Sequence, residues 1–317
     1  MLKRFAVALA FLTLVVWACQ PAQNYLDPDG PKFTGQYAPN PPVFKDTLRV
    51  VTFNIKYSEK VERAIQELRT LPDLRNADLL LLQEMDEQGV DQIARALGYN
   101  YVYYPATRHP RTGRNFGNAV LSKWPIRTSR KVLLPHAVIG LKTRRIAVYA
   151  MVRVEGQDVL VGSIHTATIW LPYDQRMAQV DSALRSLPHP MSLAVVGGDF
   201  NTLELKSLRD VERLFTRHGL TLATRHVGPT ARLGPIARKL DHVFVTGFEV
   251  LAAGVVWHSR ASDHAPVWVV LRLPPKRHSQ SGAALLQPNH QGHRKERIQF
   301  LQRHEHRLAG GTAVRRE

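Results

Sequence analysis

The feature that most constrains this chain is a series of short apolar runs, each closed or followed by a polar residue. Runs such as LRVVTFN, ADLLLLQE and LAVVGGDFN are rich in Val and Leu. Such runs are typical of strands covered on both faces, and their end residues emerge together at one edge of a sheet. The polar residues at these ends are Asn54, Glu84, His165, Asp199, Asn201, Asp241, Asp263 and His264. We therefore expect these distant residues to form one site.

The chemistry of this set suits hydrolysis of a phosphate ester with a divalent cation. Carboxylate and amide oxygens are ligands for hard cations, and histidine can move protons near neutral pH. Each residue alone has a simpler structural explanation. Glu84 could be a solvated strand-end carboxylate, Asn54 or Asn201 a turn residue, and His165 a hydrogen-bonded core histidine. The order and chemistry of the whole set favour a site.

The motifs around these residues resemble those of the endonuclease/exonuclease/phosphatase superfamily, which includes abasic-site endonucleases, pancreatic-type deoxyribonucleases, neutral sphingomyelinases, inositol phosphatases and deadenylases. The matching motifs are TFNI, LLQE, GNAVLS, GSIHT, GGDFN, LDHVFV and SDHAP, between Leu48 and Leu273. The resemblance implies an α/β fold, a four-layered sandwich of two mainly antiparallel β-sheets flanked by helices. It also implies a metal-dependent phosphoric ester hydrolase, and it says little about the substrate.

The resemblance further implies how a metal would be held. Glu84 would be the main carboxylate ligand of one Mg²⁺ or Mn²⁺, and Asn54 would lie beside it. Asp263 would support the metal or His264. Lys56 stands where some members of the superfamily carry a carboxylate, so we expect one metal rather than two.

The remaining site residues would act on protons and phosphate oxygens. By the same resemblance, His264 would be oriented by Asp241 and would polarise water or the phosphoryl oxygen. Asp199 and Asn201 would position the nucleophile. His165 would bind a phosphate oxygen or protonate the leaving group. The choice between Asp199 and His264 as the base stays open.

The N-terminus has the pattern of a secretory signal. Lys3 and Arg4 precede a thirteen-residue apolar stretch from Phe5 to Trp17, which is short for a membrane span. The stretch ends VWAC, which resembles a bacterial lipoprotein cleavage site with Cys19 as the lipidated residue, although Trp17 is unusual there. We expect residues 1–19 to be a lipoprotein signal peptide and the protein to be exported, lipid-anchored to a membrane on the periplasmic side of the cell envelope. An ordinary signal, giving a secreted protein, or an uncleaved anchor stays open.

The rest of the chain divides into three parts. Residues 20–45 contain six prolines and predict a tether that spans about 30 Å as a coil and holds the domain clear of a membrane. Residues 46–273 predict one α/β domain, long enough for a sizeable core. Residues 274–317 are rich in Gln, Gly, Arg and His and predict a basic, disordered tail. Apolar spacing in the domain predicts helices over Val61–Leu71, Asp91–Leu97, Asp174–Leu187 and Leu205–Gly219. We expect a monomer.

Positive charge gives the clearest indication of the substrate. The formal net charge is +17, and residues 92–154 contain twelve Lys or Arg and no Asp or Glu. Such a one-signed region should attract nucleic acid or an anionic lipid surface. Its loop-like part runs from Arg108 to Gly117. We therefore take Arg108, Arg111, Arg114 and Asn118 as substrate-binding candidates and favour nucleic acid over phospholipid.

Three functions remain open at this point. The preferred one is a phosphodiesterase with endonuclease-like activity. A phospholipid or sphingomyelin-type phosphodiesterase is the alternative, for which Trp170, Leu171 and Tyr173 after His165 would be suited, although such side chains are more often in the core. A non-catalytic polyanion-binding lipoprotein is the third, and the loss of a catalytic residue would indicate it. None of the expected catalytic residues is missing from the sequence.

Overall fold

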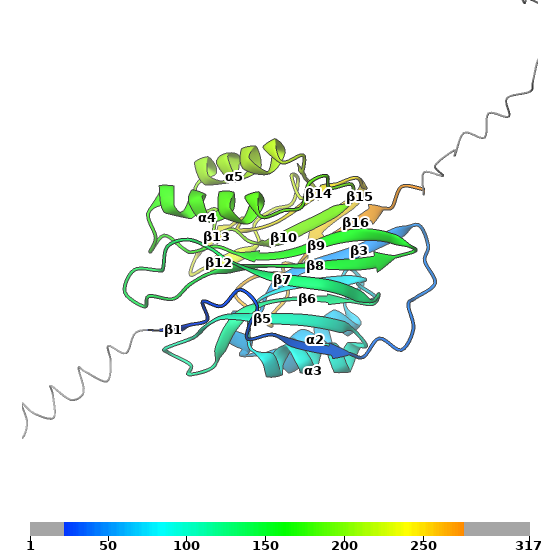
Figure 1. Cartoon of the computed structure of the whole chain (residues 1–317), viewed down its shortest axis with the longest axis horizontal. Helices are drawn as coiled ribbons and strands as arrows, with labels where there is room; N and C mark the ends of the chain where they lie inside the picture. Colours follow the sequence, from blue (N-terminus) through cyan, green and yellow to red (C-terminus); the bar gives the residue numbers. More distant parts are fainter. Residues whose placement is uncertain (1–21, 276–317) are drawn as a thin grey trace, which may run out of the picture. The chain divides into compact units, whose positions relative to one another are not determined.

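The computed structural model describes residues 22–275, which form an α/β sandwich of two sheets between two pairs of helices (Figure 1). The predicted four-layered fold is confirmed. The signal segment with Cys19 and nearly all of the predicted tail lie outside the described residues. Within residues 22–275, none of the helices is both long and apolar enough to cross a bilayer.

The first sheet has eight strands in the order β1-β5-β6-β4-β3-β16-β15, with β2 also paired to β5. Their bounds are β1 Gln23–Asn24, β2 Phe33–Gln36, β3 Thr47–Asn54, β4 Leu79–Met85, β5 Asn100–Arg108, β6 Asn115–Ser122, β15 Glu249–Val255 and β16 Val267–Arg272. Only β3 and β4 are parallel among these pairs. Because Asn54 lies opposite Gln83 in that pair, Asn54 and Glu84 emerge at the same edge of the sheet.

The second sheet has six strands in the order β11-β14-β10-β9-β8-β7. Their bounds are β7 Ile126–Leu133, β8 Ile146–Val154, β9 Gln157–His165, β10 Ala194–Asp199, β11 Thr221–Leu222 and β14 Asp241–Thr246, and a separate hairpin joins β12 Ala231–Leu233 to β13 Ile236–Arg238. Parallel pairing of β9 with β10 places His165 opposite Asp199, and antiparallel pairing of β10 with β14 places Asp241 opposite Asp199. Three predicted site residues thus lie in one row.

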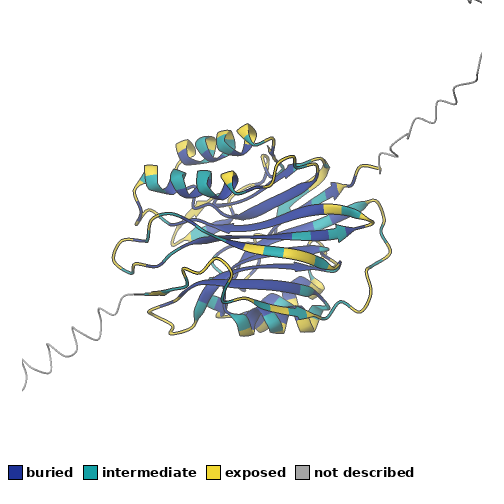
Figure 2. Ribbon diagram, in the orientation of Figure 1, coloured by how far each residue is buried: buried dark blue, intermediate teal, exposed yellow. Residues whose placement is uncertain are grey.

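Helices cover the outer face of each sheet. The helices α2 (Val61–Thr70) and α3 (Glu87–Leu97) lie on the first sheet, and α4 (Tyr173–Arg185) and α5 (Leu205–Arg217) lie on the second (Figure 1). Their buried faces point inward and their exposed residues outward (Figure 2), as expected for amphipathic surface helices. The helix α3 begins four residues before its predicted start, because the Asp86 carboxylate caps it by accepting from the Gly89 amide at 2.7 Å.

The core lies in three layers that fix the two sheets against each other. Val148 and Val243 are fully buried in the layer between the sheets, where β3 faces β10 and β4 faces β9. Ile93 belongs to the layer beneath α2 and α3. Phe215 stacks on Phe244 in the layer beneath α4 and α5, with ring centroids 3.7 Å apart. This packing brings the end of β3 against the end of β10.

The folded domain begins earlier in the sequence than predicted. The strand β1 pairs with the end of β5, and β2 pairs with its beginning. The Tyr25 hydroxyl also donates to Asn115 Oδ1 at 2.7 Å. The unpaired edge of β5 offers backbone donors and acceptors that a neighbouring segment can satisfy, and the prolines of this segment do not prevent that pairing. The tether prediction is therefore corrected for residues 23–24 and 33–36, which are strands of the sheet.

Candidate active site

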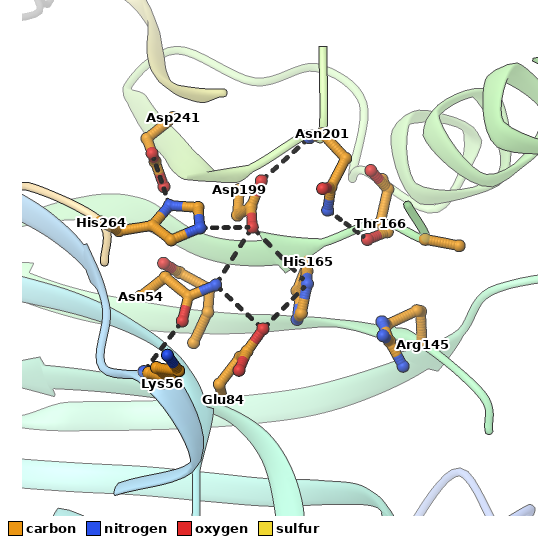
Figure 3. Close-up of polar contacts among 12 residues, drawn as sticks. Asn54, Lys56, Glu84, Arg145, His165, Thr166, Asp199, Asn201, Asp241 and His264 are labelled. Carbon is orange, nitrogen blue, oxygen red and sulfur yellow. Dashed lines mark hydrogen bonds and ion pairs between the residues drawn. The ribbon is translucent and has the colours of Figure 1, made fainter. Parts of the chain in front are cut away.

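The polar strand ends of both sheets meet around the carboxylate of Asp199 (Figure 3). Asn54 bridges the two sheets, because its Nδ2 donates to Asp199 Oδ2 at 3.0 Å and to Glu84 Oε1 at 3.2 Å. The Nε2 atoms of His165 and His264 each lie 3.7 Å from Asp199 Oδ2. Five residues that the sequence predicted to converge therefore do so.

A local irregularity aims Glu84 into this cluster. The pairing of β4 with β6 shifts register between Leu82 and Met85, and Glu84 has a φ of +58°. A residue other than glycine in this conformation costs of order 1–3 kcal/mol and persists where the surroundings enforce it. Burial raises the pKa of Glu84, and the charges of His264 and Arg145 partly oppose that shift.

Asp241 and His264 form a hydrogen-bonded pair at the side of the cluster. His264 Nδ1 lies 2.8 Å from Asp241 Oδ2, which also accepts from Thr230 Oγ1 at 2.6 Å. Because Nδ1 is engaged in this way, His264 Nε2 is turned toward Asp199. Burial opposes the charged imidazolium, but the carboxylates of Asp241 and Asp199 outweigh burial and raise the pKa of His264 to about 10.

The other two ionisable groups at the centre are shifted toward their neutral forms. Burial, with the nearby carboxylates of Asp241 and Glu84, raises the pKa of Asp199 to about 7, against the opposing charge of His264. Burial, followed by the charges of Arg145 and His264, lowers the pKa of His165 well below its ordinary value. His165 is therefore neutral, and Asp199 can exchange a proton near neutral pH.

The cluster fits a divalent cation. Ligand atoms of Asp199, Asp241 and His264 lie within 4.8 Å of one another. The 2.8 Å contact between Asp241 and His264 already uses two of these residues. Glu84 and Asp199 instead share the Asn54 amide, and burial raises the pKa of both carboxyl groups. A cation against these two carboxylates would stabilise their charged forms.

The predicted ligand Asp263 lies apart from these carboxylates, at the rim. Its Oδ2 is 3.2 Å from Lys56 Nζ, and both side chains are 40% exposed. Three consecutive residues, Lys56, Tyr57 and Ser58, have positive φ angles, and the Lys56 amide donates to Asn54 Oδ1 at 3.1 Å. This strained segment holds the Lys56 ammonium beside the site.

The two predicted asparagines contact backbone groups. Asn201 donates from its backbone amide to Asp199 Oδ1 at 2.9 Å and from Nδ2 to the Thr166 carbonyl at 2.9 Å, so it orients the central carboxylate. Asn118 is buried, and its Nδ2 donates to the carbonyls of Ile146 and Ser163. Asn118 therefore joins the two sheets, which differs from the substrate contact that we expected.

The three predicted arginines lie at the end of β5 and on the loop between β5 and β6. Arg108 Nε donates to the Gly113 carbonyl at 2.8 Å, so it fixes the loop itself. Arg114 is bound to the buried carboxylate of Asp86 at 2.8 Å and to the backbone carbonyl of Tyr57. Arg111 is exposed, and of the three it is the one best placed to meet a ligand.

Aromatic rings connect this loop to the catalytic cluster. The Tyr57 ring centroid lies 4.8 Å from that of His109, His109 lies 5.3 Å from Phe116, and Phe116 lies 5.7 Å from His165. Burial, with the charges of Arg145 and Arg111, lowers the pKa of His109 to about 4. The row is therefore neutral near pH 7, and of its rings beside the cationic loop Tyr57 is partly exposed, whereas His109 and Phe116 are buried.

Arg145 is a site residue that the sequence analysis missed. Its guanidinium is buried 5.0 Å from the Phe116 ring centroid and donates only to Thr143 Oγ1 and the Arg144 carbonyl, at 3.3 and 3.4 Å. Its Nε has no hydrogen-bond partner within residues 22–275. Figure 3 shows the guanidinium pointing toward His165 and Glu84. The sequence feature that could have identified Arg145 is its position at the start of an apolar run within the acid-free stretch of residues 92–154.

A buried cation without a hydrogen-bonded carboxylate is costly unless an anion arrives to pair with it. The charges of Glu84 and Asp199 act on Arg145 from a distance and partly offset the burial that lowers its pKa. Arginine recognises phosphate oxygens through its planar fork of donors. The site therefore offers a phosphate group a fixed positive charge next to the carboxylates and histidines.

Comparisons with known proteins agree with this geometry. The Endonuclease/Exonuclease/phosphatase family profile matches residues 51–264. Two UPF0294 proteins of Vibrio vulnificus, from strains YJ016 and CMCP6, are 35% identical over 124 residues, which is 38% of this chain and 42% of theirs. The match thus spans less than half the length of these relatives.

Solved structures share the fold. The endonuclease/exonuclease/phosphatase of Beutenbergia cavernae has a TM-score of 0.57 at 22% identity, covering 72% of each chain. D. rerio TDP2 complexed with single-strand DNA product has a TM-score of 0.57 at 15% identity, covering 72% of this chain and 99% of that one. At these identities the likeness concerns the fold alone. By the match of the family profile over residues 51–264, the chain belongs to the endonuclease/exonuclease/phosphatase family.

Proposed function

We propose that the protein is a phosphodiesterase with endonuclease-like activity that uses Mg²⁺ or Mn²⁺. The observation that carries the proposal is the buried Arg145 guanidinium beside Glu84 and Asp199, because it completes a site with both a place for a cation and a place for a phosphate. Hard oxygen ligands such as these carboxylates favour Mg²⁺ or Mn²⁺ over softer metals.

Glu84 and Asp199 would hold the cation, and Asn54 would orient both carboxylates through its amide. When bound, the cation supplies Lewis acidity toward a phosphate oxygen and lowers the pKa of water. Arg145 binds a non-bridging phosphate oxygen and holds the phosphorus near Asp199. Because Phe116 covers the guanidinium, water is kept from competing for that contact.

Proton transfer is divided between Asp199 and His264. Asp199 accepts a proton from the attacking water through the carboxylate that Asn54 and the Asn201 amide orient. His264 stays protonated, because the carboxylate of Asp241 holds its imidazolium, and it donates to a phosphoryl oxygen from Nε2. Neutral His165 donates from one ring nitrogen to a phosphate oxygen.

Nucleic acid is the substrate that the surroundings favour. Residues 92–154 carry only positive formal charge, and Arg111 stands exposed on the loop next to the site. The partly exposed Tyr57 ring lies beside that loop, at the end of the row with His109 and Phe116, and stacking of bases on an aromatic ring beside a cationic groove is a common way to hold single strands. Within the family, TDP2 has been crystallised with a single-strand DNA product.

A phospholipid phosphodiesterase is a second candidate, favoured by one observation. Trp170, which follows His165 in the chain, is 69% exposed, whereas aromatic side chains at such positions are more often buried. A substrate panel of plasmid DNA, single-stranded RNA, phospholipid vesicles and a phosphomonoester, each with Mg²⁺ and with chelator, separates the candidates. Cleavage of vesicle phospholipid with intact plasmid would contradict the nuclease proposal.

The role of the basic loop can be measured separately. Arg111→Gln should weaken DNA binding and reduce the slope of log affinity against log salt by about 1, because one phosphate contact releases about 0.9 counterion on duplex DNA. Arg111 is preferable to a change of all three arginines, because Arg108 and Arg114 also hold the loop together. Arg217→Gln, an exposed residue at the end of α5, is the matched control. Equal slopes for both variants would remove the loop from the proposal.

Export and lipid attachment at Cys19 are also part of the proposal, supported by the apolar stretch from Phe5 to Trp17 and by Cys19 being the only cysteine. Mass spectrometry of the membrane fraction should find a diacylglyceryl group on Cys19, and Cys19→Ser should abolish it. A mature N-terminus elsewhere, without lipid, would contradict lipid attachment. We propose a monomer, which sedimentation would test.

A further inference from the structure

Three large apolar side chains stand exposed on two neighbouring loops near the site. Ile139, between β7 and β8, is 61% exposed, and Ile169 and Trp170, after β9, are 59% and 69% exposed. The Ile139 amide donates to the Trp170 carbonyl at 3.4 Å, so the two loops meet. We call these three side chains the apolar tip. Grouped apolar residues of this size on a surface mark a contact with a partner or a membrane.

The apolar tip is supported from beneath. Val138, Ala167 and Leu171 form a small buried cluster between the same loops. The Gln179 side chain on α4 forms hydrogen bonds to both loops. Its Oε1 accepts from the Ala167 amide at 2.8 Å, and its Nε2 donates to the Pro135 carbonyl at 2.9 Å. The fold therefore presents the tip in a defined place.

The beginning of the described chain is fastened to one of these loops. Asn24 Nδ2 donates to the Lys142 carbonyl at 2.9 Å, and the Arg144 amide donates to Asn24 Oδ1 at 2.8 Å. Cys19 precedes Asn24 by five residues, which reach about 18 Å at most when fully extended. A lipid on Cys19 would therefore be at most about 18 Å along the chain from Asn24, which contacts the loop that carries Ile139.

Charge around the apolar tip suits an anionic membrane surface. Lys142 is exposed and Arg144 half-buried on the loop of Ile139, and the acid-free stretch continues through residue 154. Exposed Trp and Ile beside Lys and Arg is the usual composition of surfaces that dip into the lipid headgroup region. His165 ends β9 directly before the loop of Ile169 and Trp170, and Arg145 lies between the loop of Ile139 and the start of β8, so the site lies at the same end of the sandwich.

We infer that the apolar tip docks on an anionic phospholipid bilayer and turns the edge of the sheets that carries the active site toward the membrane. The short connection to a lipid on Cys19, which rests on the proposed lipid attachment, and the tip then act together, the first by tethering and the second by orienting. This inference goes beyond the proposed function, because it does not depend on which phosphate ester is cleaved.

The test measures insertion directly, without activity. The full chain carries Cys19→Ser, which removes its only cysteine, and an environment-sensitive fluorophore is attached at Ile139→Cys. The matched control is Val43→Cys, which is 88% exposed ahead of β3, at the opposite end of the strand from Asn54. Vesicles of phosphatidylethanolamine and phosphatidylglycerol with brominated acyl chains should shift the emission of the label at 139 to shorter wavelength and quench it, and should leave the label at 43 unchanged.

Adding Ile169→Ser and Trp170→Ser to the chain labelled at 139 should reduce the quenching at least about fivefold, because none of the three apolar side chains of the tip then remains to be buried in the bilayer. Thermal melting checks that these variants fold. Equal responses at 139 and 43 would show tethering without orientation, and no response at 139 would show no insertion. A response of the label at 139 to single-stranded oligonucleotide in place of vesicles would assign the tip to base stacking. Each of these three results overturns the inference, and none depends on whether the protein cleaves DNA.

Discussion

Replacing Arg145 with methionine should separate activity from stability. If a phosphate oxygen is the missing partner of this guanidinium, the substitution removes two charge-assisted hydrogen bonds of about 1.5–3 kcal/mol each in the transition state. The sum of about 3–6 kcal/mol corresponds to a loss of roughly 10²–10⁴ in kcat/KM. Arg145→Lys keeps the charge and loses the fork, so its loss should be intermediate.

The folded protein should tolerate the same change. Arg145 donates only two long hydrogen bonds, to Thr143 Oγ1 and the Arg144 carbonyl, and its contact with the Phe116 ring contributes roughly 0.5–2 kcal/mol. Methionine retains apolar contact with that ring and removes the cost of burying a charge. We therefore expect the free energy of unfolding to change by less than about 1.5 kcal/mol.

Two assays on the same samples decide the matter. Initial rates on bis(p-nitrophenyl) phosphate at saturating Mg²⁺ give kcat/KM, and urea unfolding gives stability. If Arg145 were a structural residue, Arg145→Met would lose about 3–5 kcal/mol of stability. The molecules that remain folded would then have the wild-type kcat/KM. That pair of results would refute a phosphate-binding role.

Four further outcomes follow from the structure. Glu84→Gln should abolish hydrolysis and weaken Mn²⁺ binding in a titration followed by electron paramagnetic resonance, without unfolding the domain, and hydrolysis that survives saturating chelator would contradict the metal mechanism. His264→Ala should slow turnover by at least ~10², and Asp241→Asn should lose a substantial part of that through misorientation of the imidazole, so a wild-type rate in either variant would exclude the pair. Lys56→Asp should raise the number of bound Mn²⁺ ions from one to two, because it replaces an ammonium with a carboxylate at the rim of the site. An unchanged number of bound ions would contradict the idea that Lys56 excludes a second metal. Burial raises the pKa of Asp78 to about 6 against the Arg49 amide and nearby positive charges. The native state then binds the proton more strongly than the unfolded chain, so the free energy of unfolding should fall by about 2–3 kcal/mol as the pH rises from about 4 to above 6, and Asp78→Asn should remove that dependence in urea unfolding.

The sequence was sufficient to predict the fold and most of the cluster. Apolar runs such as LLLL before Glu84 and AVV before Asp199 are typical of strands buried on both faces, and such a strand leaves its end residue at an edge of the sheet. The resemblance of the motifs supplied the sandwich and the order of the site. These are local patterns, which do not depend on how distant segments pair.

Tertiary structure decided what depends on pairing between distant segments. The register shift in β4 turns Glu84 inward, and packing of β8 beside β6 buries Arg145 over Phe116 without a carboxylate partner. Likewise, the free edge of β5 captures residues that composition alone assigns to a tether. The sequence shows which side chains are present. It does not show which strand edge stays free or which buried cation lacks a carboxylate partner. These two features are fixed only when the sheets pack, because burial is a property of the whole fold.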